Sequence, residues 1–251
     1  MSLIDRGSGQ AVVLIPGIQG RWEWMKPAVN ALAERCRLIA FSLGPATSTA
    51  DTIREIDAAL DQARLDRAVI CGVSLGGVVS LRYALERPER TRGIVLVSTP
   101  GPRWEANRRQ AYFAEHWAAA SPLFALNAVM VMVPEVIRAR GGLVRGLIYA
   151  AKHGTRVLMH PTSPRRMKQR YELWLAAKRN EDYARIAAPT LIVTGERHLD
   201  RVVPVDGTLE YAARIKGARV ERLERTGHIG LITRPERFAE IVTQFAEACG
   251  E

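Results

Sequence analysis

Residues 67–85 read RAVICGVSLGGVVSLRYAL, and this stretch decides the fold. Its first part, ending at Cys71, is a continuous apolar run without alternation, which is typical of a strand buried on both faces of a parallel sheet. Its last part, from Val78 to Leu85, has the composition of a helix. The change falls within Gly72-Val73-Ser74-Leu75-Gly76, so the sequence predicts a tight turn from a strand into a helix.

The same alternation of strand and helix patterns extends to both sides of this turn. Further strands are expected at residues 11–15, 37–41, 93–97, 189–194 and 218–223, and further helices near 51–63, 206–215 and 235–248. Buried strands that alternate with amphipathic helices predict an open, mostly parallel α/β sheet.

One long segment departs from this alternation. Residues 101–185 show no strand pattern but four helical stretches, expected at about 104–119, 123–138, 142–152 and 164–180. The sequence therefore predicts an α/β core formed by residues 1–100 and 186–251, interrupted by a helical cap at 101–185.

The composition fits one globular protein of 251 residues, of which 47% are hydrophobic. The N-terminus lacks the layout of a secretory signal, and three widely spaced cysteines offer neither a disulfide framework nor a metal cluster. We expect a cytoplasmic protein without a metal or another cofactor.

Ser74 is the candidate nucleophile because it stands at the centre of a Gly-x-Ser-x-Gly turn between a strand and a helix. Glycines at 72 and 76 remove side chains that would collide in such a turn. The turn also places the Leu75 amide at a helix N-terminus beside the hydroxyl. The alternative is an ordinary turn, but the strand before it and the helix after it favour the nucleophile.

A serine nucleophile needs a base, and the base needs a carboxylate. His228 follows the last expected strand and is flanked by glycines, although a solvated loop histidine is the plainer interpretation. Asp200 is the preferred carboxylate, Glu196 is second, and Asp206 is third because it stands at an expected helix start. The chain order Ser74, Asp200, His228 is typical of proteins with this turn.

An oxyanion needs a second backbone donor beside Leu75. Pro16-Gly17-Ile18-Gln19-Gly20 follows the first strong strand and ends at the same edge of the sheet. We expect the Ile18 amide to be this donor, with a simple turn as the alternative.

These motifs resemble the α/β-hydrolase superfamily, and in particular its esterase-like serine hydrolases with a helical cap. The resemblance implies a mostly parallel sheet with the cap inserted after the sixth strand. It also implies Ser74, Asp200 and His228 as a catalytic triad. The loop between Gly195 and Asp200 is longer than is usual in the family. The opening hairpin is expected to be reduced to one strand near residues 2–5, giving seven or eight strands.

A serine at this position favours acyl transfer, because family members that open epoxides or displace halide use aspartate there. We expect a carboxylic-ester hydrolase that forms an acyl-enzyme. The alternatives are a thioesterase acting on acyl-carrier-protein esters, a lactonase, a hydrolase of carbon–carbon bonds, and a catalytically silent binding module of the same fold.

The positive charge of the chain is concentrated in the cap. Residues 103–182 contain fourteen lysines and arginines but six acids, which accounts for an excess of eight in a net charge of +10. A solvated surface is the plainer explanation. The alternative is an anionic substrate or an acidic carrier protein bound at the cap. We expect no nucleic-acid partner, since no recognition motif accompanies the charge, and no stable insertion into a membrane.

The apolar run at 123–133 is expected to pack on the core or to roof a pocket for an apolar acyl group. Met130 and Met132 are the candidate lining residues in this run, and Gly17 is the candidate from the core.

Overall fold

The computed structural model describes residues 3–177 and 181–250, which form a seven-stranded sheet in the order β1-β3-β2-β4-β5-β6-β7. All neighbouring strands are parallel except β1, which pairs antiparallel with β3. The strands are β1 (Leu3–Arg6), β2 (Ala11–Ile15), β3 (Arg37–Phe41), β4 (Ala68–Val73), β5 (Thr91–Val97), β6 (Thr190–Thr194) and β7 (Arg219–Arg222). The predicted mostly parallel sheet is confirmed.

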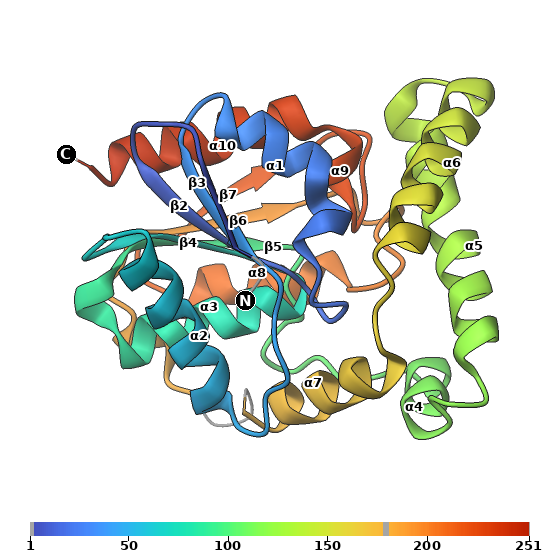
Figure 1. Cartoon of the computed structure of the whole chain (residues 1–251), viewed down its shortest axis with the longest axis horizontal. Coiled ribbons are helices and arrows are strands. Elements are labelled where there is room, and N and C mark those ends of the chain that lie inside the picture. Colours follow the sequence, from blue (N-terminus) through green and yellow to red (C-terminus); the bar gives the residue numbers. More distant parts are fainter. Residues whose placement is uncertain (1–2, 178–180, 251) are drawn as a thin grey trace.

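Helices cover both faces of the sheet (Figure 1). Val12 and Leu14 of β2 face one helical layer, whereas the alternating residues Val13 and Ile15 face the other. Strands buried on both faces need apolar side chains at every position, which explains the unbroken apolar runs. The first layer contains α1 (Lys26–Ala33), α9 (Gly230–Thr233) and α10 (Pro235–Ala248), and the second contains α2 (Thr49–Gln62), α3 (Leu75–Glu86) and α8 (Val205–Arg214).

The cap is formed by helices inserted between β5 and β6, and its described residues contain no strand. They are α4 (Arg108–Glu115), α5 (Ser121–Arg140), α6 (Leu143–Met159) and α7 (Pro164–Ala177). In Figure 1, α5 and α6 lie at one side of the sheet, beyond α9, whereas α4 lies at their lower end and α7 lies below α3.

Three expectations about the cap need correction. The helix expected at about 104–119 is the shorter α4, which begins after the Asn107 cap and ends at Glu115. The insert follows the fifth strand rather than the sixth, because β1 alone stands where the family has a hairpin. Helix α6 continues to Met159 rather than ending near residue 152. It does so through Gly154, whose cost in a helix interior is only about 1 kcal/mol and is tolerated.

The turn between β4 and α3 depends on two glycines. A Cβ at Gly72 would lie 2.1 Å from the Gly76 carbonyl oxygen. A Cβ at Gly76 would lie 2.6 Å and 2.7 Å from the carbonyl oxygens of Ile15 and Pro16. The start of α3 is therefore packed against the carboxyl end of β2 at a distance that only glycine allows.

We expect Gly76→Ala to lower the free energy of unfolding by about 1–3 kcal/mol, because the new Cβ would push against main-chain atoms that cannot yield easily. Gly154→Ala is the matched control, since Gly154 also lies in a helix but has nothing near its Cβ position. That change should stabilise the protein by up to about 1 kcal/mol through helix propensity. Urea unfolding measures both, and equal effects of the two substitutions would contradict the packing described.

Candidate active site

Ser74 occupies the turn between β4 and α3 with φ 53° and ψ −121°, a conformation that a residue with a side chain rarely adopts. Its amide donates to the Val97 carbonyl at 2.7 Å, and its carbonyl accepts from the Gly77 amide at 2.9 Å. Strain of this kind costs about 1–3 kcal/mol and persists only where the surroundings enforce it. The partly exposed side chain of Ser74 is thus held at the end of the strand by main-chain contacts.

Two backbone donors are available near Ser74. Gly17 adjoins the serine, since a Cβ there would lie 3.3 Å from the Ser74 Cβ. Within the part of the chain that the structure describes, neither the Ile18 amide nor the Leu75 amide donates a hydrogen bond. Leu75 is also the first residue of α3, where the helix dipole favours negative charge.

The loop that carries Ile18 is held by the cap. The guanidinium of Arg170, on α7, donates to the carbonyl of Ile18 at 3.1 Å and to that of Leu43 at 2.9 Å. The Thr162 hydroxyl donates to the Gln19 carbonyl at 2.7 Å. Arg170 is 6% exposed, and this burial lowers the pKa of its guanidinium. Nothing in the sequence distinguished Arg170 from the other basic residues of the cap.

Asp200 and His228 form a buried pair, with Oδ2 of the aspartate 3.3 Å from Nδ1 of the histidine. The other carboxylate oxygen of Asp200 accepts from the amides of Val202 and Val203 at 3.0 Å and 2.9 Å. The aspartate is therefore fixed at both oxygens, and its contact leaves Nε2 of His228 as the free ring nitrogen.

The two other candidate carboxylates face elsewhere. Glu196 accepts from the Arg225 amide at 2.6 Å, and Asp206 pairs with Arg197 at 2.7 Å. The preference for Asp200 over both agrees with this geometry, although the loop that begins at Gly195 is longer than usual. The loop still meets the histidine segment, because the Glu196 amide donates to the Thr226 carbonyl at 2.7 Å.

Electrostatics favour an ionised aspartate beside the histidine. Burial opposes the charge of Asp200, but the nearby His228 and the two amide donors outweigh it and lower the pKa of this carboxyl. Burial likewise opposes a charged His228, but the Asp200 carboxylate raises the pKa of the imidazole above its usual range. The pair thus favours an imidazolium, the species that a general base becomes after it takes a proton.

In the described segments no hydrogen bond joins the Ser74 hydroxyl to His228. Nucleophile–base contacts of this kind are commonly long without substrate and tighten when it binds.

A second buried carboxylate beside His228, in addition to Asp200, was not expected from the sequence. Glu135, on α5, is 1% exposed and accepts from the Ile229 amide, with both carboxylate oxygens at 3.1 Å. Burial raises the pKa of Glu135 to about 7, although the backbone donors and the charge of His228 oppose the rise. The sequence signal was slight: Glu135 is the sole acid between residues 121 and 160.

The expected substrate-lining residues separate into two groups. Gly17 adjoins Ser74, as described above. Met130 is 66% exposed and, by helical spacing, lies on the side of α5 away from Glu135. Met132 is partly buried on the Glu135 side. The structure therefore does not bring Met130 to the candidate site.

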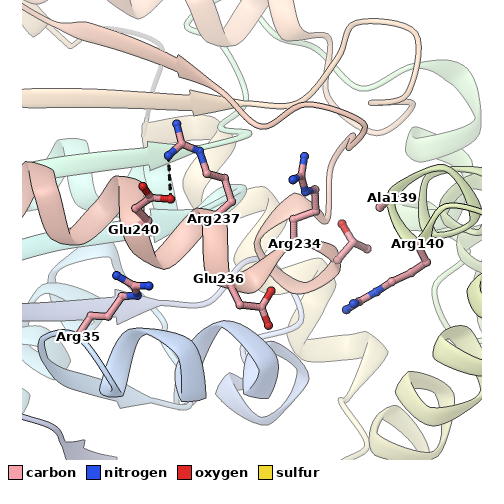
Figure 2. Close-up of a pocket in the computed structure, with 8 residues that line it drawn as sticks. Arg35, Ala139, Arg140, Arg234, Glu236, Arg237 and Glu240 are labelled. Carbon is pink, nitrogen blue, oxygen red and sulfur yellow. Dashed lines mark ion pairs between the residues drawn. The ribbon is translucent and has the colours of Figure 1, made fainter.

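A surface pocket of about 400 Å³ lies apart from Ser74, between the end of α5 and α10 (Figure 2). Within it, Arg237 pairs with Glu240 at 2.8 Å, and the Arg140 guanidinium lies 3.8 Å from the centre of the Tyr149 ring. Its lining is mainly charged: Arg35, Ala139, Arg140, Thr233, Arg234, Glu236, Arg237 and Glu240. None of the candidate catalytic residues belongs to this pocket.

In the residues that the structure covers, no group of three or more His, Cys, Asp or Glu side chains is placed to hold a metal ion.

The parallel sheet, the strained serine turn and the helical cap are the features of an α/β hydrolase. The family described as "Alpha/beta hydrolase family" matches residues 12–241. The chain belongs to this family.

Known relatives are similar over almost the whole chain. One from Azorhizobium caulinodans, named "Putative carbamate hydrolase RutD", is 25% identical over 98% of this chain and 93% of its own length. A meta-cleavage product hydrolase from Pseudomonas fluorescens IP01 has a TM-score of 0.75 and 22% identity, covering 98% of this chain and 94% of its own. A thermophilic esterase from Thermogutta terrifontis has a TM-score of 0.78 and 18% identity, covering 99% of this chain and 93% of its own. The two structures support the fold alone.

We expect Glu135→Gln and Asp200→Asn each to lower the pKa of His228, because each removes a negative charge that stabilises the imidazolium. The histidine resonances of the folded protein, followed by NMR against pH, measure this directly. Glu115→Gln, at an exposed acid of α4, is the matched control and should leave the His228 titration unchanged. An unchanged His228 titration in Glu135→Gln would show that this carboxylate does not act on the imidazole.

Proposed function

We propose that this protein is a serine hydrolase that cleaves carboxylic esters through an acyl-enzyme intermediate. The observation that carries the proposal is the strained Ser74 turn, placed beside two backbone amides for which the described residues provide no acceptor. Strain at a partly exposed serine is hard to explain by stability, since it costs free energy. A nucleophile that must stand clear of the sheet explains it.

In the proposed reaction, the Ser74 hydroxyl attacks the ester carbonyl while Nε2 of His228 takes its proton. Asp200 holds Nδ1 of the histidine and stabilises the imidazolium. The amides of Ile18 and Leu75 donate to the oxyanion of the tetrahedral intermediate. The alcohol leaves with the proton from His228. Water then attacks the acyl-enzyme in the same way, which releases the acid and restores Ser74.

The family does not fix the bond that is cleaved. The similar proteins are named for carbamate, for a meta-cleavage product and as an esterase. Thioesters, lactones and carbon–carbon bonds next to a carbonyl are alternatives that the same residues would serve. We favour a small ester with an apolar acyl group, because an alkoxide leaving group needs only the proton of His228, whereas a carbon leaving group is far more basic and a poorer leaving group.

We expect Ser74→Ala to reduce turnover of p-nitrophenyl acetate or butyrate by about a thousandfold or more, because the nucleophile is lost while the fold is kept. Ser8→Ala, at an exposed serine in a loop, is the matched control and should retain wild-type turnover. Retained turnover in Ser74→Ala would refute the assignment. A wild-type protein that turns over no ester, thioester or lactone would instead support a binding module without catalysis.

A panel with one acyl group in different linkages distinguishes the candidate bonds. We expect kcat/KM to be higher for the p-nitrophenyl and alkyl esters than for the matching thioester, lactone and aryl ketone. A series of acyl lengths then tests the apolar acyl pocket. Faster turnover of any other linkage would keep Ser74 as nucleophile but would overturn the ester assignment.

A further inference from the structure

The cap exposes an apolar stripe that no part of the described chain covers. Val144, Leu147, Ile148, Leu158 and Met159, all on α6, are each at least half exposed, and Leu158 reaches 80%. We call these five residues the outer face of α6. Val144, Leu147 and Ile148 are neighbours on the helix surface, and Leu158 and Met159 lie on the same side about three turns further along, beyond the exposed Ala151 and Thr155. Exposed apolar groups scattered singly are ordinary, but several on one side of a helix mark a surface that meets another apolar surface.

The geometry of α6 shows that this face points away from the protein. Tyr149 donates from its hydroxyl to the Ile232 carbonyl of the core. Gly146 lies so close to α5 that a Cβ would be 2.7 Å from the Ile137 Cα. At about 100° per residue, the five residues of the outer face occupy an arc about 120° wide on the side opposite to these contacts.

Charge on α6 has one sign. Arg145, Lys152 and Arg156 fall along one edge of the outer face, and α6 contains no aspartate or glutamate. In the described part of the chain none of the three is paired with a carboxylate. The sole acid of residues 121–160 is Glu135, which is buried beside His228.

We propose that the outer face of α6 binds the surface of a lipid bilayer that carries anionic headgroups. An amphipathic helix with an apolar face and basic flanks lies in the plane of such an interface. Its apolar side chains enter the boundary of the acyl chains, and its cations meet the headgroup phosphates. None of the helices in the described segments is long and apolar enough to cross a membrane, so the contact would be superficial.

A second copy of the chain fits this face less well. A symmetric dimer places the same patch against itself, so Arg145, Lys152 and Arg156 would meet their own counterparts without a nearby carboxylate on α6. Like charges brought together in an interface are unfavourable. An acidic carrier protein would also neutralise the cations of α6. The test must therefore distinguish such a protein from an anionic bilayer.

The test measures co-sedimentation of the full chain with vesicles of phosphatidylcholine, with or without phosphatidylglycerol. We expect at least about tenfold stronger partition onto the anionic vesicles. The variants Leu147→Ser/Leu158→Ser and Arg145→Glu/Lys152→Glu should each lose about tenfold or more. Val220→Ser and Arg222→Glu, at exposed positions of β7, are the matched controls and should bind like the wild type.

No binding of the wild type to anionic vesicles, or equal binding of the α6 variants and their controls, would overturn the proposal. If the wild type does not bind vesicles, two other results would assign the face to a different partner. Loss of a dimer in size-exclusion chromatography in the α6 variants would assign it to a second copy, and loss of binding to an acidic carrier protein would assign it to that protein. Turnover of p-nitrophenyl butyrate should be unchanged in all four variants, because none of these residues belongs to the Ser74 site. Vesicle binding and ester turnover are therefore measured independently, so loss of one does not decide whether the other proposal is correct.

Discussion

The close approach of α3 to the end of β2 is the constraint on which the site depends. Because Gly76 has no side chain, the helix start rests against the carbonyls of Ile15 and Pro16. The next residue along that loop is Gly17, which adjoins Ser74. This packing contact, together with the hydrogen bonds of the Ser74 main chain to Val97 and Gly77, holds the serine in its strained conformation, and it brings the loop with the Ile18 amide next to it. Parallel neighbouring strands make this possible, since β2 and β4 end at the same edge of the sheet.

Two buried charges then tie the cap to the loops on either side of Ser74. Arg170 reaches from α7 to the carbonyl of Ile18, and Glu135 reaches from α5 to the amide of Ile229. Burying a charge is expensive unless several hydrogen bonds satisfy it, and both side chains have such bonds. The cap is thus a structural part of the candidate site. Glu135 accepts a hydrogen bond from Ile229, the residue next to His228, and its charge also raises the pKa of the imidazole.

Local patterns in the sequence predicted the parallel sheet, the Ser74 turn and the preference for Asp200, because each depends on residues close together in the chain. Glycine spacing and unbroken apolar runs are local properties. The roles of Glu135 and Arg170 could not be predicted, because they arise from how α5 and α7 pack on loops far away in the sequence. The same holds for Met130, since an apolar run does not reveal which side of its helix meets the core.

The proposed reaction requires that Ser74 is a nucleophile activated by His228. Treatment of the native protein with a fluorophosphonate, followed by mass spectrometry of the digested chain, tests this requirement. We expect one phosphonyl group, on the peptide that contains Ser74, and its loss in a folded His228→Ala variant. A protein that stays unmodified, or a phosphonyl group on a different residue, would show that Ser74 is not the nucleophile.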